Sequence, residues 1–414
     1  MGSTRRVVAI MALATGAVVA NLYYAQPLED TLASAFRAST GAVGLVITLI
    51  QVGYAIGLAT LVPLGDLLER RKLLVTLLVV TVAGLVVMAT APSLAVLGSA
   101  AVLVGITSVA VQIVVPFAAH IAEEGQQGRV VGTVMSGLLI GILLSRTVSG
   151  LVAQVASWRA VFALGAVLTA VVAALLWREL PTLEPTTTMR YHTLLRSVLR
   201  LVREEPTLRL RTLYGGLLFA SFSVFWTSCG FLLARTYHWN DAAIGAFALV
   251  GAAGALAARF AGRLADRGHA HLATGGFIGL AALSYALIAL GGHSVIALVI
   301  GVAVLDLGAQ GTHISNQSLI YRLRADARSR LNTAYMTCYF VLGATGSGLS
   351  AAAYSTGGWT AVCLLGAAFP VLGLLVWVVE MVRLRRAGSA RNPARPAANH
   401  EARPPALDRG PGAS

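Results

Sequence analysis

The feature that most constrains the fold of this chain is a series of long runs without a charged residue. The longest of them cover residues 73–122, 268–305 and 331–379. A helix that crosses a membrane needs about 20 consecutive apolar residues, so each of these runs can hold two crossings. Only 12% of the residues are charged, against about a quarter in soluble proteins. The sequence therefore predicts an all-α polytopic membrane protein.

Turn signals divide the longest runs into separate helices. They are Ala-Pro-Ser at 91–93, Gly-Gly-His at 291–293 and Ser-Thr-Gly-Gly at 355–358, and residues of these types favour turns. We therefore expect twelve transmembrane helices, over about residues 8–28, 42–62, 73–90, 94–119, 129–154, 159–178, 211–234, 242–261, 271–291, 294–318, 330–355 and 359–380.

The basic residues are sorted by side of the predicted membrane. Of the 31 Lys and Arg residues, 27 fall in the terminal segments and loops of one face, whereas the loops of the other face hold only Arg37, Arg159 and Arg235. Short loops rich in Lys and Arg stay in the cytoplasm. We therefore expect a multi-pass protein of a bacterial cytoplasmic membrane with both termini cytoplasmic. The net charge of +14 then has an explanation other than nucleic-acid binding, and no nucleic-acid partner is expected.

No motif in the sequence predicts catalysis, a metal or a bound cofactor. Cys229, Cys338 and Cys363 fall within predicted helices and lack metal-binding spacing. Walker loops, dinucleotide-binding glycine loops and catalytic-triad spacings are absent from the sequence. Arg5 and Arg6 precede a long apolar run without a small-residue cleavage site, which predicts an uncleaved first helix. We therefore expect neither an enzyme nor an ATP-driven pump, and no cofactor, with a proton gradient as the driving force.

The two halves of the chain look duplicated. Residues 129–162 align without gaps on 330–363, and the loop 63–72 aligns on 262–271 at nearly the same offset. Repeated halves are the architecture of alternating-access transporters, whose binding site lies between the repeats. We predict an N-terminal six-helix bundle (1–180), a cytoplasmic central loop (181–209), a C-terminal six-helix bundle (210–382) and a disordered basic cytoplasmic tail (383–414).

Two loops and one helix end resemble a known family. "LGDLLERRK" (64–72) and "GRLADRG" (262–268) are similar to the loop motif Gly-x-Leu-Ala-Asp-Arg-x-Gly-Arg-Arg of the major facilitator superfamily. "NLYYAQPL" (21–28) is similar to the end of the first helix in its bacterial branch of sugar, nucleoside and drug exporters. The resemblance covers residues 1–380 and implies that charged loop residues gate the transporter, besides fixing its topology. These gating residues are Asp66, Arg70, Arg71, Asp266 and Arg267.

The chain departs from the antiporter motifs of the family that it resembles. Residues 101–105 read "AVLVG", where the drug antiporters have an arginine in helix 4. In helix 5 the glycines at Gly137 and Gly141 are kept, whereas Ser145 and Arg146 replace a glycine pair. The usual explanation of proton antiport therefore does not transfer to this sequence unchanged.

Two charged residues lie inside predicted helices. Arg146 falls in helix 5 and Asp306 near the centre of helix 10, and a charge at such a depth costs from about 2.5 to 17 kcal/mol unless it faces protein or water. Two interpretations follow: a structural pair between the halves, or a coupling site at which Asp306 takes up a proton and releases Arg146. We favour the coupling site, because intramembrane ionisable residues are functional candidates by default.

Asp306 begins a polar stripe on an otherwise apolar helix. Gln310, His313 and Gln317 follow at spacings of four, three and four residues, which keeps all four side chains on one face. His313 is either a proton carrier between Asp306 and the cytoplasm or a hydrogen-bonded residue near the helix end. The family resemblance implies that helices 1, 4, 7 and 10 line the central cavity, so this stripe is expected to face the substrate.

The same four helices supply the predicted substrate-binding residues. Aromatic and amide groups together suit a partly apolar, uncharged small molecule that is held by stacking and a few hydrogen bonds. Alternatively, the aromatic side chains only pack the helices together or anchor them at the membrane surface. The predicted cavity residues are Asn21, Tyr24, Gln112, Phe222, Trp226, Gln310 and Gln317.

These features together predict a monomeric secondary active transporter that works by alternating access. The favoured function is proton-coupled efflux, by antiport, of a small organic molecule such as a drug, nucleoside or sugar. The expected partners are that substrate, protons and the lipid bilayer. The direction of transport rests on the family resemblance alone. A proton-coupled importer or facilitator of a metabolite shares every feature named above, and a transporter-like sensor without transport is a further alternative.

Overall fold

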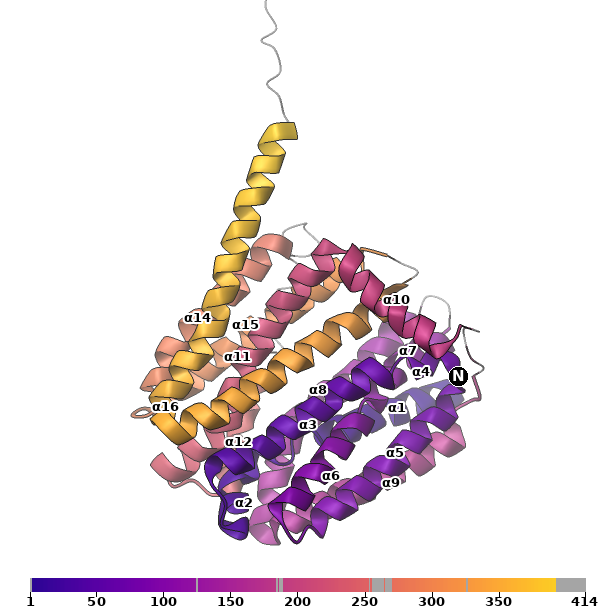
Figure 1. Ribbon diagram of the computed structural model, residues 1–414. Coiled ribbons are helices and arrows are strands. Elements are labelled where there is room, and N and C mark those ends of the chain that lie inside the picture. Colours follow the sequence, from indigo (N-terminus) through magenta and orange to yellow (C-terminus); the bar gives the residue numbers. More distant parts are fainter. Residues whose placement is uncertain are drawn as a thin grey trace, which may run out of the picture. The chain divides into compact units, whose positions relative to one another are not determined.

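The computed structural model describes residues 2–123, 126–183, 185, 189–252, 254, 264, 270–324 and 327–391, and every regular element within these ranges is a helix (Figure 1). Nine of the described helices are long and apolar enough to cross a membrane. The predicted all-α polytopic fold is therefore confirmed. Contacts divide the chain into two units, Met1–Leu374 and Leu375–Ser414. The bundle boundaries near residues 180 and 210 stay a prediction.

The N-terminal part of the chain begins most of its long helices at a polar cap. Ser39, Ser93 and Ser157 each accept a hydrogen bond from the backbone N–H three residues ahead, and Glu69 accepts two, which satisfies donors that the first helical turn leaves unpaired. The elements are α1 (Gly2–Ala20), η1 (Gln26–Leu28), α2 (Glu29–Phe36), α3 (Thr40–Thr60), α4 (Leu64–Leu67), α5 (Arg70–Ala89), α6 (Leu94–Thr107), α7 (Ala110–Ile121), α8 (Gln127–Val155) and α9 (Trp158–Glu179).

The first predicted helix, 8–28, ends earlier than expected. α1 stops at Ala20, and residues 21–25 form a turn before the 3-10 helix η1. Pro27 lies in the first turn of η1, a position that tolerates its missing N–H. Side chains beyond Ala20 therefore do not follow the periodicity of α1, which alters the predicted site.

In the C-terminal part, the last two predicted helices form one continuous element. The predicted helices 330–355 and 359–380 form a single element that breaks at Gly358, where φ is 62° and ψ is −154°, a conformation that glycine adopts readily. The predicted helix 242–261 is described only as far as 252 and at 254. The elements are α10 (Tyr191–Glu204), α11 (Pro206–Thr236), α12 (Asp241–Phe247), η2 (Ala248–Ala252), α14 (Ala270–Leu290), α15 (Val295–Ile320) and α16 (Arg328–Arg391).

α1 packs against α8 along a seam of small residues. Gly137 lies against the backbone of Ala12, and Gly141 lies against the backbone of Gly16. Small residues let helix backbones approach closely in a membrane, where association depends on van der Waals packing. This seam holds α8, and with it Arg146, at a defined position relative to α1.

We expect Gly141→Ala to destabilise the protein by about 1–3 kcal/mol, because the added methyl group overlaps the backbone of Gly16 and the two helices must separate. Gly132→Ala is the matched control, since a Cβ at Gly132 of the same helix has nothing within 4 Å. Denaturation of the purified protein in detergent measures both changes. Equal stability of the two variants would show that the seam is not a close contact.

Candidate transport site

Arg146 is buried inside the helical bundle, and no carboxylate among the described residues pairs with it. The side chain on α8 is 4% exposed. Its Nε donates a hydrogen bond of 2.6 Å to Oε1 of Gln26, and its Nη1 donates one of 3.3 Å to the backbone oxygen of Ile142. The guanidinium carbon lies 4.4 Å from the ring centre of Tyr23 and 4.6 Å from that of Trp226. Cation–π contacts and one amide therefore stabilise this charge, as expected for a desolvated guanidinium.

Asp306 lies on α15 and contacts Trp226, the same residue that contacts Arg146. The side chain is 3% exposed, and its Oδ1 accepts a hydrogen bond of 3.4 Å from Nε1 of Trp226. η2 packs closely here, because a Cβ on Gly251 would lie 2.7 Å from Asp306 Oδ2. Asp306 and Arg146 make no direct ion pair in the described part of the chain. Trp226 instead links them, with its ring face toward the cation and its N–H toward the carboxyl.

An aromatic cluster surrounds a small cavity next to this linked pair. The rings of Phe219 and Tyr339 stack at 4.1 Å, and the rings of Tyr54 and Phe340 lie 4.4 Å apart. The cavity volume is only about 10 Å³, roughly the space of one water molecule, so the helices are closed at this level. Its lining residues are Leu22, Tyr23, Gln26, Ile50, Gln51, Tyr54, Phe219, Phe222, Ser223 and Phe340.

The polar stripe that begins at Asp306 diverges from the expected arrangement. His313 shares a hydrogen bond of 3.0 Å with the hydroxyl of Tyr335, and Gln317 donates one of 3.5 Å to Asn332. Both partners belong to α16. Gln310 lies against Gly254. In the described contacts, His313 of α15 forms its hydrogen bond with α16. No described contact connects it to Asp306.

Two of the predicted cavity residues lie away from Arg146 and Asp306. Asn21 donates a hydrogen bond of 3.2 Å to Thr169 of α9, and the ring of Tyr24 packs against Gly165 of the same helix. The turn after Ala20 is the physical reason, because it rotates Tyr23 instead of Tyr24 toward the centre.

Gln112 and Phe222 lie closer to the expected position. Gln112 donates a hydrogen bond of 3.2 Å to the hydroxyl of Tyr54, which lines the cavity. Phe222 lines the cavity itself, and its ring lies 6.0 Å from that of Trp226. The structure adds residues that the sequence pattern did not single out, namely Tyr23, Gln26, Gln51, Tyr54, Phe219, Ser223 and Phe340.

The first predicted gating loop folds back on its own half of the chain. Arg70 donates a hydrogen bond of 2.9 Å to the backbone of Gly65 and forms an ion pair of 3.2 Å with Asp66. Arg71 donates a hydrogen bond of 3.1 Å to Leu180, at the end of α9. These contacts hold the loop in one arrangement but do not test its gating role. Asp266 and Arg267 of the second loop lie outside the described residues.

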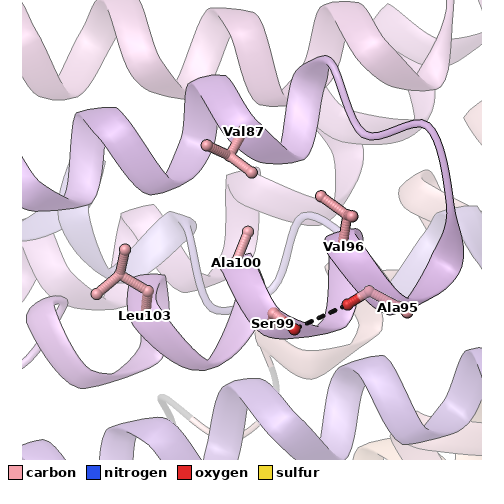
Figure 2. Close-up of a pocket in the computed structure, with 6 residues that line it drawn as sticks. All are labelled: Val87, Ala95, Val96, Ser99, Ala100 and Leu103. Atoms are coloured by element: carbon pink, nitrogen blue, oxygen red, sulfur yellow. Dashed lines mark hydrogen bonds between the residues drawn. The ribbon is translucent and has the colours of Figure 1, made fainter.

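A second hollow, on α5 and α6, has no chemistry for binding a polar substrate. Figure 2 shows its lining, in which the one side-chain hydroxyl, of Ser99, donates a hydrogen bond of 2.9 Å to Ala95 in its own helix. Val87 is 43% and Leu103 is 38% exposed. Apolar exposed side chains on a membrane-spanning hairpin suit contact with lipid.

Apolar helices of membrane-spanning length around two buried, oppositely charged residues define a multi-pass membrane transporter. The chain belongs to the Major Facilitator Superfamily, whose sequence profile matches residues 8–347 and 212–409. The predicted fold of this family is thereby confirmed, and the protein is a membrane transporter of that type.

Bacterial relatives resemble the chain over most of its length. It is 49% identical over 371 residues to the putative uncharacterized transporter YgaY of Escherichia coli (strain K12), which covers 89% of this chain and 94% of the relative. It is 33% identical over 379 residues to the probable transporter SCO4007 of Streptomyces coelicolor, with 91% and 87% covered. The crystal structure of the nucleoside transporter NupG superposes with a TM-score of 0.75 at 12% identity, over 91% of this chain and 99% of that one. This last similarity concerns the fold alone.

We expect Gln26→Leu to destabilise the protein by about 1.5–3 kcal/mol, because it removes the one side-chain hydrogen bond described for the buried Arg146 cation. Gln26→Glu is the control, since its carboxyl can accept the same bond, and it should keep the stability. Denaturation in detergent measures both variants. If Gln26→Leu is as stable as the parent protein, the amide does not support the cation.

Proposed function

We propose that the protein is a secondary active transporter that exports a small organic molecule in exchange for protons. The observation that carries this proposal is the buried carboxyl of Asp306, which lies beside the buried cation of Arg146 but is not paired with it. A stable structural pair would join the two groups directly. A carboxyl that is separated from its counter-ion by one ring suits a site that gains and loses a charge.

Asp306 is the proposed proton carrier. A carboxylate at this depth without a directly bound cation costs more than the neutral acid, so the described conformation suits a protonated Asp306. Loss of the proton places a negative charge next to the indole N–H of Trp226, 3.4 Å away. A hydrogen bond to an ionised acceptor is shorter and stronger. Trp226 and Arg146 are then drawn toward Asp306.

This charge change acts on the contact between two helices from different halves of the chain. Arg146 belongs to α8, whereas Trp226 belongs to α11 and Asp306 to α15. The face of the Trp226 ring is where the cation of α8 meets α11. In alternating access, the two halves rock against each other around a central site. A proton on Asp306 would therefore bias the position of α8 relative to α11.

The cavity lining supports an uncharged, partly aromatic substrate. The rings of Tyr23, Tyr54 and Phe222 offer stacking surfaces, and Gln51 and Ser223 offer hydrogen-bonding groups beside them. Pockets of this kind hold ligands mainly by apolar contact and orient them with a few polar groups. Nucleosides and aromatic drugs have this chemistry, and the similarity of residues 21–28 to exporters of such compounds supports export as the direction.

The membrane and its orientation are part of the proposal. The asymmetric distribution of Lys and Arg supports cytoplasmic termini, and the bacterial relatives support a bacterial cytoplasmic membrane. With this orientation, the loop that contains Asp66 lies in the cytoplasm, and helix α2, which contains Asp30, lies at the outer end of the membrane-spanning helices.

We expect inside-out vesicles with an acidic interior to accumulate at least one compound from a panel of a nucleoside, an aromatic antibiotic and a hexose. Asp306→Asn should reduce this proton-driven accumulation to the level of vesicles without the protein, because the amide carries no exchangeable charge. Exchange of labelled for unlabelled compound should persist, since it needs no net proton movement.

Glu179→Gln is the matched control for this measurement, because its carboxylate is partly exposed and pairs with Arg6, away from the described Trp226 contacts and from α2. It should accumulate the compound as the parent protein does. Unchanged proton-driven accumulation in Asp306→Asn would refute Asp306 as the carrier. Accumulation only in vesicles of the opposite orientation would identify an importer.

A further inference from the structure

Three consecutive residues of α2 fasten it to helices of the C-terminal part. Glu29 lies against Gly230 of α11. Asp30 forms an ion pair of 3.1 Å with Arg235 of α11, and Thr31 donates a hydrogen bond of 2.7 Å to Asp241 of α12. We refer to this contact, Glu29 to Thr31 with its partners, as the α2 latch. It joins segments about 200 residues apart in sequence, at the end of the helices opposite to the Asp66 loop.

The two acidic residues of the latch are in contrasting environments. The side chain of Asp30 is 38% exposed and forms an ion pair with Arg235, whereas Glu29 is 0% exposed. Among the described residues neither carboxyl oxygen of Glu29 makes a hydrogen bond of ordinary geometry, although the backbone of Phe231 lies near enough to stabilise a negative charge there. A buried carboxylate without a well-aligned donor or a paired cation is strongly unfavourable. The neutral acid is the form that fits this position.

The fit around Glu29 is close enough to exclude water. A Cβ on Gly230 would lie 2.8 Å from Glu29 Oε2 and 3.1 Å from the backbone oxygen of Gln26, so only glycine permits this approach. Gly44 of α3 lies against Ala351 of α16 and near Thr227 of α11, one turn before Gly230. Because Glu29 is fully buried, its carboxyl reaches solvent only if an element packed on it moves away, and α11 makes the closest described contact.

Burial raises the pKa of Glu29 well above its usual range. The backbone of Phe231 opposes this shift, and the nearby Asp30 adds to it. Burial also raises the pKa of Asp241, against the hydrogen bond from Thr31, so Asp241 needs its own control. The titratable groups that neighbour Glu29 or belong to the latch are Asp30, Cys229, Arg235, Asp241 and Tyr354.

We propose that Glu29 is a second proton-binding site, which holds its proton only while the α2 latch is closed. When the latch opens, the carboxyl reaches water and releases the proton to it, becoming a carboxylate. The latch closes again only when the carboxylate takes up one proton from the solution on that side. Closure of this end of the transporter is thus linked to one proton. The inference rests on the alternating access of the proposed function but not on Asp306 as its proton carrier.

The direction of the pH dependence follows from the shift. Because the pKa of Glu29 is raised in the closed latch, acid favours closure and the closed form is lost as pH rises. Between the pKa of the open form and that of the closed form, one linked proton changes the ratio of open to closed molecules about tenfold per pH unit.

Distance measurement between two spin labels on either side of the latch tests this linkage without a substrate. The labels are attached to Ala35→Cys in α2 and Thr236→Cys in α11, in full-length protein whose three native cysteines are replaced by alanine. In lipid nanodiscs, the short-distance population should fall as pH rises. Glu29→Gln, a neutral group of the same size, should keep this population constant at all pH values.

Two matched variants separate Glu29 from its neighbours. Asp241→Asn should retain the pH dependence of the labelled parent protein. Asp30→Asn should also respond to pH, but with its midpoint at lower pH, because the charge of Asp30 adds to the raised pKa of Glu29. A parent protein that does not respond to pH, a Glu29→Gln variant that responds as the parent does, or loss of the response in Asp241→Asn would each overturn the proposal. Because Asp306 is intact in all variants, failure here leaves the transport experiment on Asp306→Asn unaffected.

Infrared spectroscopy offers a second measurement that needs no labels or cysteine replacement. A protonated buried carboxyl absorbs separately from a carboxylate, and the band of Glu29 should be present in the parent protein at acidic pH. It should disappear on alkaline titration and be missing from Glu29→Gln at every pH. A difference spectrum between parent and variant without such a band would show that Glu29 is ionised, and would refute the proposal even if the variant folds poorly.

Discussion

The contact between the Arg146 guanidinium and the face of Trp226 is the constraint around which the centre of this transporter is arranged. A buried cation needs partners, and here it has two rings, one amide and one backbone carbonyl. None of these partners changes its charge near neutral pH. The carboxyl proposed to do so, Asp306, accepts the hydrogen bond of Trp226 on the other side of the indole. In the proposed mechanism this separation would keep the cation stable in either protonation state of Asp306, while the charge of Asp306 would still act on it through one ring.

These contacts of Arg146 require that the neighbouring helix backbones lie close together. Glycines allow this close approach on both sides of Arg146. Gly141 packs α8 on α1, and Gly245 of α12 lies against the backbone oxygen of Arg146 itself. Thr147 adds a hydrogen bond of 2.9 Å to Gly245. One helix of the N-terminal part is thus held against both α1 and α12 by bare backbone.

The fold and half of the candidate site follow from properties that a linear sequence carries. Long runs of apolar residues determine where helices cross a membrane. A charged residue within such a run, such as Arg146 or Asp306, can be recognised without a structure. The sequence pattern singled out Tyr24 and not Tyr23, because helical periodicity was extended through residues 21–25, which form a turn. Glu29 was missed for another reason. It lies just beyond a predicted helix, and its burial comes from α11, which is 200 residues away and beyond the reach of local patterns.

One short segment connects the two places where protons are proposed to act. Gln26 accepts the hydrogen bond of Arg146, and three residues later Glu29 is enclosed by α11. The intervening η1 contains Pro27, whose fixed φ removes one degree of freedom between them. A displacement of Arg146 toward Asp306 therefore pulls on Gln26, and through a stiff turn it pulls on the helix that carries Glu29. Conversely, separation of α2 from α11 moves the amide that supports the cation. If both proposals hold, opening of one end and the charge state of the centre would be coupled through covalent geometry, without a chain of ionisable residues between them.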